Sequence, residues 1–343
     1  MNKNDSAPTL QDVARKAGVS TATVSRCFNN PERVVEATRD RILRIVDELG
    51  YTPHFGGRAL ASNRSNTVGA IIPTMENAIF ARGLQAFEET LAENGLTLLV
   101  ASSGYDPERE LKQIRTLISQ GADGLLLIGH ARPDKTYAFL KQRKIPYVIT
   151  WNYRADASCF NVGFNNRKAA FQLAQKVIGY GHRHIGMISG QTEFNDRATD
   201  RVNGVRDAMK HSAIPDDQLT IIRTTYSLTD GGDAFTQLMA HTPRPTAIIC
   251  GNDVLATGAI GRAIESGIHI PNDVSITGFD DIDLAEVIRP KLTTVHVPHR
   301  RMGETAARLL LEIIIDGTDC RSIELDTELV IRESLAQAPN TDC

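Results

Sequence analysis

The chain has 343 residues, enough for two or three domains with full hydrophobic cores. Hydrophobic residues make up 41% and charged residues 23%, as in soluble globular proteins, and no apolar run is long enough to span a bilayer. The net charge of −3 is uneven: residues 1–66 hold ten Lys or Arg against seven Asp or Glu, a balance of +3, and the remainder carries −6. This distribution agrees with nucleic-acid contact through the N-terminal part alone.

Residues 10–30, LQDVARKAGVSTATVSRCFNN, predict two short helices joined by a tight turn. Thr9 can cap the first helix, and Asp12, three residues later, completes an acidic form of the capping box. Gly18 stands where the chain can turn through a left-handed conformation, and Ser20 can cap the second helix. The second helix is expected to present outward Thr21, Ala22, Ser25 and Arg26. Such a set near a helix N-terminus suits a helix that enters the DNA major groove.

A third helix is predicted over 36–49, where aliphatic residues recur at helical spacing. Gly50 would end this helix, and Pro53 prevents its continuation. Three helices of this size form an all-α head over residues 1–51 that can fold on its own. The residues that follow, 52–67, are rich in Gly, Ser, Asn and Arg, which is typical of a linker.

From residue 68 onward, apolar strands alternate with amphipathic helices, a pattern that predicts parallel sheets covered by helices. The first round has predicted strands at 68–73, 96–101, 124–129 and 146–150. The second round has predicted strands at 185–189, 219–223, 247–251 and 274–278, with helices near 165–178, 198–211, 231–241 and 253–266. A last strand, 293–297, precedes a long helix, 298–316. Two doubly wound α/β subdomains facing each other form a crevice, and ligands bind beyond the carboxyl ends of such strands.

The chain resembles the lactose-repressor (LacI/GalR) family of bacterial transcription factors in three segments: LQDVARKAGVSTATVSRCFNNPERVVEATRDRILRIVDELGYTP, RPTAIICGNDVLATGAIGRAIESGIHIPNDVSITGFDD and PKLTTVHVPHRRMGETAARLLLE. Within that family, NNPERV, NAIFARGL and GYDPERE look most like the gluconate-repressor branch. The resemblance implies a helix-turn-helix headpiece at 1–51, a hinge at 52–67 that becomes helical on operator DNA, and a dimeric, periplasmic-binding-protein-like core at 68–343. One subdomain of the core would comprise about 68–160 with 292–320, and the other about 161–291 with 321–343.

The resemblance also implies which residues contact DNA. Base contacts are expected from Thr21, Ala22 and Arg26, and phosphate contacts from Ser20, Thr23, Ser25 and Asn29. Arg26 is the strongest candidate because a guanidinium can pair with O6 and N7 of guanine; a phosphate contact is the alternative. Leu60 matches the hinge leucine that inserts into the minor groove, with packing beneath the core as the alternative. Gly56 and Gly57 stand where the family more often has helix formers, so the hinge should be helical only on DNA.

A second group of residues is expected around the crevice. The resemblance implies that the effector pocket is lined by Phe80, Arg197, Asn252 and Asp280, and we add Asn152, which follows the strand 146–150. An arginine with amide and carboxylate groups suits the hydroxyls and carboxylate of a sugar or sugar acid, and an aromatic wall suits a sugar's C–H face. Helix capping is the alternative role for Asp280. For Arg197, which we place in the loop after the strand 185–189, the alternative is an exposed surface position.

Signals of catalysis are missing from the sequence, which has no GxGxxG, Walker A, GxSxG or HExxH motif. The five cysteines are scattered without a CxxC pair, which favours reduced thiols in the cytosol over disulfides or a zinc site. His182 and His184 are better explained by a basic loop than by a metal pair. We therefore expect neither an enzyme, nor a cofactor, nor a metal site.

The resemblance implies a cytoplasmic homodimer that represses a carbohydrate or sugar-acid catabolic operon, each head reading half of a pseudo-palindromic operator. A small sugar-like effector in the crevice would control operator affinity allosterically, as an inducer that weakens DNA binding. The alternative is a solute-binding protein for sugars without a regulatory role, which the DNA-binding head and the lack of a signal sequence disfavour. A Rossmann-type enzyme is a third interpretation, disfavoured by the missing phosphate-binding glycines.

Overall fold

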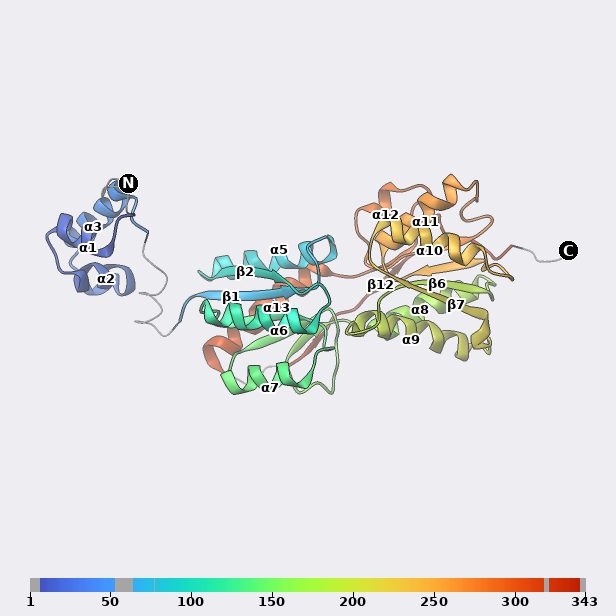
Figure 1. The fold of residues 1–343 in the computed structure, drawn as a ribbon, viewed down its shortest axis with the longest axis horizontal. Coiled ribbons are helices and arrows are strands. Elements are labelled where there is room, and N and C mark those ends of the chain that lie inside the picture. The colour runs from blue at the N-terminus through green and yellow to red at the C-terminus, as the bar shows by residue number, and fades with distance from the viewer. Residues whose placement is uncertain (1–6, 53–63, 77, 318–320, 340–343) are drawn as a thin grey trace. The chain divides into compact units, whose positions relative to one another are not determined.

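The computed structural model describes residues 7–52, 64–76, 78–317 and 321–339, which belong to two compact units (Figure 1). One unit contains the N-terminal helices, and the other contains most of the α/β core. Leu60 and the two glycines of the expected hinge lie outside the described residues. None of the described helices is both long and apolar enough to cross a membrane.

The head consists of α1 (Leu10–Ala17), α2 (Thr21–Asn29) and α3 (Glu36–Leu49), with a single 3-10 turn at Pro31–Arg33. The Thr9 hydroxyl accepts from the backbone N–H of Asp12, and the Asp12 carboxylate accepts from the backbone N–H of Thr9 at 2.9 Å, which confirms the predicted capping box. Gly18 ends α1 at φ 65°, and the Ser20 hydroxyl accepts from the backbone N–H of Thr23 at 3.1 Å. Local sequence therefore determines the turn between α1 and α2.

The head has a hydrophobic core of its own. Its buried side chains come from all three helices: Val13, Ala14, Ala17, Val24, Cys27, Ile42 and Ile45. Burying a Val or Ile side chain contributes about 1.5–3 kcal/mol, so a few such residues hold three short helices together. Burial also raises the pKa of the Cys27 thiol, which keeps that thiol protonated.

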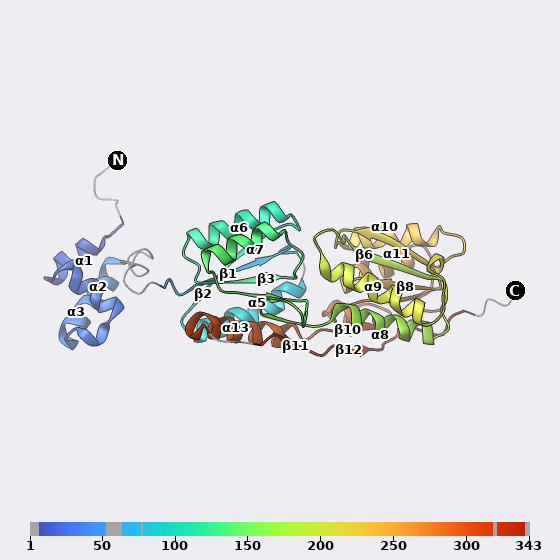
Figure 2. The same cartoon turned by 90° about the horizontal axis from the view of Figure 1, so that it is seen from below.

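The first subdomain of the core is built on a six-stranded sheet with the order β11-β5-β4-β3-β1-β2. Its strands are β1 (Thr67–Ile72), β2 (Thr97–Ser102), β3 (Gly124–Ile128), β4 (Tyr147–Thr150), β5 (Asn161–Gly163) and β11 (Ile323–Glu324). Its helices are α5 (Ala78–Glu93), α6 (Pro107–Ser119), α7 (Asp134–Arg143) and α13 (His299–Asp316). Figure 2 shows α6 and α7 on one face of the sheet and α5 and α13 on the other. Because β1, β3 and β4 pair in parallel, with Leu126 opposite both Ala70 and Val148, their carboxyl ends meet at one edge.

The second subdomain contains a four-stranded parallel sheet with the order β7-β6-β8-β9. Its strands are β6 (Ile185–Gly190), β7 (Leu219–Thr224), β8 (Ala247–Cys250) and β9 (Ser275–Thr277). Its helices are α8 (Asn166–Gly179), α9 (Asp196–His211), α10 (Leu228–Met239), α11 (Asp253–Glu265) and the short α12 (Leu284–Val287), with a 3-10 turn at Asp216–Gln218. The pair α8 and α9 covers one face, and α10 and α11 cover the other (Figures 1 and 2).

A two-stranded antiparallel pair, β10 (Thr294–His296) and β12 (Glu328–Val330), lies beside the second sheet. It is joined to the end of β9 through isolated bridges from Thr277 to Thr293 and from Asp280 to His296. These bridges hold the segment after β9, which contributes to the site described below.

The predicted strands and helices are present close to their expected bounds, but three short strands, β5, β11 and β12, were not predicted. Near the expected subdomain boundaries, at about 161 and 321, β5 and β11 both pair with the first sheet. Ile149 of β4 lies opposite Asn161 of β5, and Val162 of β5 lies opposite Ile323 of β11, so both strands belong to the first sheet. They cover the backbone groups that β4 would otherwise expose as an edge strand.

Candidate functional sites

The outward face of α2 carries the residues predicted to read DNA. Ser20, Thr21, Ala22 and Arg26 are exposed, and Thr23 and Ser25 are half-buried. The first turn of α2 has no acidic residue, so the positive end of the helix dipole favours a phosphate there. Arg26 forms no ion pair with any acid in the described part of the head, which leaves its guanidinium free for an external acceptor.

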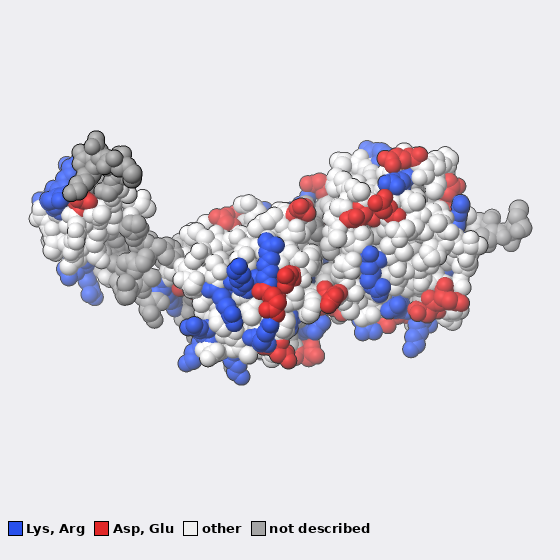
Figure 3. All heavy atoms as spheres, viewed as in Figure 1, with Lys and Arg blue, Asp and Glu red and all other residues white. Residues whose placement is uncertain are grey.

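Two predicted DNA contacts cannot be placed, because the side chain of Asn29 and all of Leu60 lie outside the described residues. The Ser20 hydroxyl is already engaged, since it caps α2 and lies 2.9 Å from the Thr23 hydroxyl. Arg41 and Arg44 of α3 are exposed as well. The face of the core seen in Figure 3 instead mixes Lys and Arg with Asp and Glu.

In the core, a pocket of about 20 Å³, the inner pocket, opens at the carboxyl ends of strands from both sheets. Its lining residues are Ile79, Phe80, Tyr105, Trp151, Arg197, Arg201, Tyr226, Asn252 and Asp280. The structure thus brings together four of the five predicted effector residues, Phe80, Arg197, Asn252 and Asp280, from distant parts of the chain.

Three buried polar atoms of residues that line the inner pocket have no partner within the described structure, and two of them belong to Asn252 and Asp280. Asn252 caps α11 by accepting from the backbone N–H of Leu255 at 2.9 Å, but its Nδ2 donor is unpaired. Asp280 accepts from Arg201 through Oδ1 at 3.4 Å, but its Oδ2 is unpaired. Both residues are only 1% exposed, and an unpaired buried polar group costs about 1–3 kcal/mol. Asp280 does not cap a helix, since α12 begins at Leu284.

Arg201 organises this side of the pocket. Its Nε donates to Oδ1 of the Asn166 side chain at 2.9 Å, and its Nη1 donates to the backbone carbonyl of Gly251. Its guanidinium lies over the ring of Phe279, 3.7 Å from the ring centre. These three contacts fix the position of the Arg201 guanidinium, from which it also donates to Asp280.

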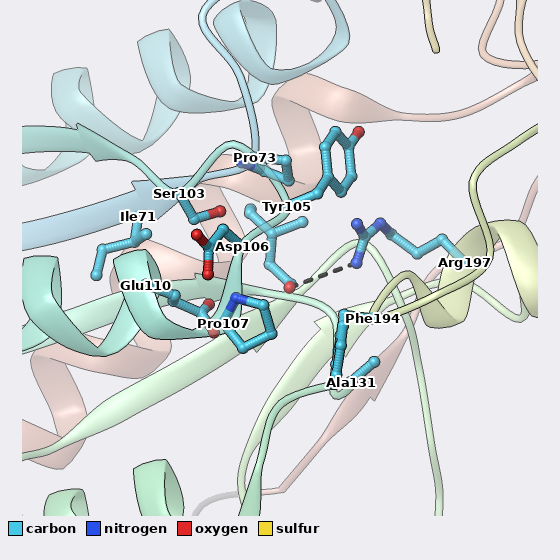
Figure 4. Close-up of a pocket in the computed structure, with 11 residues that line it drawn as sticks. Ile71, Pro73, Ser103, Tyr105, Asp106, Pro107, Glu110, Ala131, Phe194 and Arg197 are labelled. Atoms are coloured by element: carbon cyan, nitrogen blue, oxygen red, sulfur yellow. Dashed lines mark hydrogen bonds between the residues drawn. The ribbon is translucent and has the colours of Figure 1, made fainter. Parts of the chain in front are cut away.

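Asp196 and Arg197, at the start of α9, connect the second subdomain to the end of β3. Arg197 Nη1 pairs with Asp196 Oδ1 at 2.9 Å. The same atom donates to the Ile128 carbonyl at 3.4 Å, and Figure 4 draws this bond as the dashed line at Arg197. Asp196 Oδ2 accepts from the backbone N–H of His130 at 2.7 Å. A side chain at Gly129, which has φ 68°, would collide with both Asp196 and Arg197. We call Ile128, Gly129, His130, Asp196 and Arg197 the latch.

Asn152 belongs to the support of the latch rather than to the inner pocket, which corrects its predicted role. Its Nδ2 donates to Asp196 Oδ2 at 2.8 Å and to Asp200 Oδ2 at 2.9 Å, so both amide N–H groups are used. This side chain, which follows β4 of the first subdomain, reaches α9 of the second. Burial alone would raise the pKa of Asp196, but attraction to Arg197 and the hydrogen bonds from His130 and Asn152 hold it below its ordinary value.

Three residues of the inner pocket have backbone conformations that are unusual for residues with side chains. Tyr105, Trp151 and Asp280 have φ values of 61°, 64° and 108°. Such conformations cost about 1–3 kcal/mol each and persist where the surrounding structure imposes them, often at ligand sites. The residues with strained backbones therefore line the same pocket as the unpaired polar atoms.

Trp151, the only tryptophan of the chain, lies between Phe80 and His299. Its ring centre is 5.4 Å from that of Phe80, edge to face, and 6.2 Å from that of His299, stacked. Within the described structure, Trp151 Nε1 and His299 Nδ1 have no hydrogen-bond partner. Burial lowers the pKa of His299 to about 3, so its ring is neutral near pH 7.

Two buried carboxyl groups near the pocket have raised pKa values. Burial, with repulsion from Asp280, raises the pKa of Asp253 to about 8. Burial raises the pKa of Asp280 to about 6, although attraction to Arg201 opposes the shift. Asp253 accepts from the backbone N–H of Ile282 at 2.8 Å and from the Thr294 hydroxyl at 2.5 Å. Near pH 7, Asp253 is therefore mostly neutral and Asp280 mostly charged.

Comparison with known proteins identifies the family. Residues 9–54 match the model of bacterial regulatory proteins of the lacI family, and residues 174–335 match the periplasmic binding protein-like domain. The HTH-type transcriptional repressor PurR of Klebsiella pneumoniae (strain 342) is 33% identical over 337 residues, which cover 97% of this chain and 98% of that protein. The chain belongs to the LacI family. This LacI-family protein is a DNA-binding transcriptional regulator, as its head motif predicted.

Solved structures of LacI-family regulators share the fold. A LacI-family regulator from Silicibacter pomeroyi has a TM-score of 0.88 at 28% identity, covering 96% of this chain and 99% of that one. GntR from Chromobacterium violaceum has a TM-score of 0.73 at 31% identity, covering 78% and 99%. The CelR–cellobiose complex has a TM-score of 0.68 at 28% identity, covering 95% and 99%. These structures confirm the helical headpiece and the parallel-sheet α/β core.

Five residues that line the inner pocket of this LacI-family regulator were not among the predicted effector residues: Ile79, Tyr105, Trp151, Arg201 and Tyr226. Arg201 carried a signal, because it lies four residues after Arg197 on α9 and therefore on the same helix face. The loop expected around these arginines is helical from Asp196, since the Asn195 side chain caps α9. Arg197 is only 7% exposed, so the surface alternative is wrong.

Proposed function

We propose that this LacI-family regulator represses a carbohydrate or sugar-acid catabolic operon and that a sugar or sugar acid in the inner pocket weakens its binding to operator DNA. The observation that carries the proposal is the unpaired Asn252 Nδ2 and Asp280 Oδ2, buried beside two arginines. A ligand with several hydroxyl groups supplies the acceptor and the donor that these atoms need. The CelR relative, solved with cellobiose, supports this class of ligand.

The rest of the inner pocket agrees with the same ligand class. Phe80 and Trp151 offer aromatic surface to the C–H face of a sugar ring, and the Trp151 N–H is free to donate. Arg197 and Arg201 also suit a carboxylate, because a guanidinium pairs with one through two parallel hydrogen bonds. The resemblance to the gluconate-repressor branch makes gluconate the first acid to test, and the likeness to GntR gives it limited support.

On the DNA side, we assign base reading to the exposed face of α2, with Arg26 on a guanine and Thr21 and Ala22 beside it. Ser20, Thr23, Ser25 and Asn29 would contact phosphates, and Leu60 would insert into the minor groove. One such head makes few base contacts, so a homodimer on a pseudo-palindromic operator supplies the needed specificity.

The alternatives fit less well. A solute-binding protein would use the core alone and has no use for a head that matches the lacI family over residues 9–54. An enzyme finds no support among the relatives, which are transcriptional regulators. A regulator that acts on bacterial DNA works in the cytoplasm.

The latch offers a route from effector to DNA. Arg197 lines the inner pocket and pairs with Asp196, which accepts hydrogen bonds from the first subdomain through His130 and Asn152. A ligand that engages Arg197 competes with this pairing and so changes the angle between the subdomains. Effector and operator binding are then linked reciprocally, by about 1–3 kcal/mol.

Operator titrations without and with saturating effector test the proposal, once the operator has been selected from a random-sequence DNA pool. We expect the effector to raise the operator Kd about 5- to 150-fold. Asp280→Asn should abolish this response and leave effector-free DNA binding intact, whereas Asp326→Asn, at an exposed position outside both cavities, should behave like the wild type. Equal Kd values with effector shown to be bound would refute the coupling. Loss of DNA binding in Asp280→Asn would show that Asp280 is structural.

A further inference from the structure

Two of the cavities in the crevice share lining residues and differ greatly in size. The inner pocket measures about 20 Å³, which holds about one water molecule. Next to it lies a cavity of about 530 Å³, the outer cavity, whose volume is within the range of about 300–1,000 Å³ typical of small-molecule sites. The inner pocket therefore anchors part of a ligand, and most of the available volume lies outside it.

Tyr105 and Tyr226 line both the inner pocket and the outer cavity. Tyr105 follows β2 in the first subdomain, and Tyr226 follows β7 in the second. Their ring centres are 6.0 Å apart at an interplanar angle of 31°. Tyr226 is fixed by a hydrogen bond from Asn195 Nδ2 at 3.2 Å and packs where Gly190 has no side chain. A ligand held by the inner pocket must continue past these two aromatic faces.

The rest of the outer cavity is rich in hydroxyl and amide groups from both subdomains, among them Ser102, Gln191, Thr225 and Ser227. It also contains one acid, Glu76, and one base, Arg109, whose Nη2 lies 3.5 Å from the Ser102 hydroxyl. Balanced charge, many neutral donors and acceptors, and two aromatic faces match a sugar ring better than a phosphate or an apolar group.

We propose that the outer cavity is a second subsite that takes a further sugar ring, so that the effector is a glycoside of at least two rings. This inference rests on the proposed sugar effector and adds its size and the place of its second ring. The first ring lies at the mouth of the inner pocket, and one of its polar groups reaches into that pocket to meet Asn252 and Asp280. The second ring packs on the two tyrosines and reaches Arg109 and Gln191.

Matched pairs of sugars test the second subsite in the full-length protein. Binding of glucose against cellobiose and maltose, galactose against melibiose, and xylose against xylobiose is measured by calorimetry and by the fluorescence of Trp151, the sole tryptophan. We expect a disaccharide to bind at least about tenfold more tightly than its monosaccharide, since several hydrogen bonds are added.

Two variants, one from each subdomain, test where the second ring binds. Arg109→Ala and Gln191→Ala should each weaken disaccharide binding, by about tenfold for the arginine, and spare the monosaccharide, which does not reach them. Arg244→Ala, an exposed arginine outside both cavities, is the matched control.

Three results would overturn the second subsite and leave the sugar effector in place. These are equal affinity for both members of every pair, tightest binding by a single-ring acid such as gluconate, and disaccharide affinities that Arg109→Ala and Gln191→Ala do not change. Binding of 4-nitrophenyl glucoside as tight as that of cellobiose would overturn the assignment to a sugar ring in favour of an apolar group. Failure of every sugar and sugar acid to bind would overturn the sugar effector itself, and the second subsite with it.

Discussion

The head and the inner pocket differ in how far apart their interacting residues lie along the chain. In the head, the groups that shape the DNA-reading helix are neighbours, as the capping box of Thr9 and Asp12 and the turn at Gly18 show. In the inner pocket, Phe80, Arg201 and Asp280 come from separate elements of two subdomains.

The two regions also differ in how their polar groups are satisfied. Arg26 of the head is exposed, so water accepts the hydrogen bonds of its guanidinium in the absence of DNA. Asn252 and Asp280 each have a buried polar atom without a hydrogen-bond partner, and burial keeps water from pairing with these atoms. Three residues of the same pocket have strained backbones. The head is therefore stable and ready to bind, whereas the pocket stores an energetic cost that a ligand can relieve. Each prediction below changes one kind of contact and asks whether its effect stays local.

The largest effect is expected at the latch. Gly129→Ala would force a methyl group against Asp196 and Arg197 and separate a buried ion pair, which costs about 3–5 kcal/mol. Gly267→Ala is the matched control, because Gly267 has φ 70° and no atom within 4 Å of an added Cβ. Urea unfolding followed through Trp151 should show the control losing only the backbone cost of about 1–2 kcal/mol. Equal losses in the two variants would show that the latch contributes nothing.

The next effect concerns the head. Arg26→Ala should cost about 1–3 kcal/mol at one base pair of each half-site and leave binding to other sequences nearly unchanged. The measurement is a set of operator titrations in which each base pair is changed in turn. A uniform loss across all sequences, with a smaller salt dependence, would identify Arg26 as a phosphate contact.

The third effect depends on pH and comes from the buried carboxyl group of Asp253. Its pKa is raised from 3.8 to about 8, so the folded protein binds this proton more tightly than the unfolded chain does. The stabilisation is complete below about pH 4 and is lost as the pH rises through about 8, by at most about 1.4 kcal/mol per pH unit. Asp253→Asn keeps an acceptor for the Ile282 N–H and removes the titration.

Melting temperatures of the wild type and Asp253→Asn between pH 4.5 and 8.5 check this prediction. The wild type should lose stability with rising pH relative to the variant, which should be comparatively more stable at pH 8 than at pH 5. Parallel curves would mean that Asp253 keeps an ordinary pKa in the folded protein.

The smallest effect is expected from the capping box. Thr9→Ala removes the hydroxyl that accepts from the Asp12 N–H, which costs about 1 kcal/mol. Hydrogen exchange in the full-length protein should speed up in α1 and remain unchanged in the core helices. Faster exchange throughout the core would contradict the local character of the head.

The sequence alone predicted most of the architecture, and the reason lies in the range of the interactions. Caps, turn glycines and the periods of apolar residues act within one or two helical turns or one strand, so the three head helices and the main strands of the core could be predicted close to their bounds. The family resemblance then indicated Phe80, Arg197, Asn252 and Asp280, which the structure brings to one pocket.

Tertiary structure decided the rest. Only the packed core shows that Asn152 supports the latch, that Trp151 and Tyr226 line the pocket, and that β5 and β11 extend the first sheet. None of these follows from local pattern, because a side chain at the end of a strand can face the crevice or a neighbouring helix. The unpaired atoms of Asn252 and Asp280 likewise exist only because distant segments exclude water from them, and that exclusion favours a ligand that can pair with these atoms.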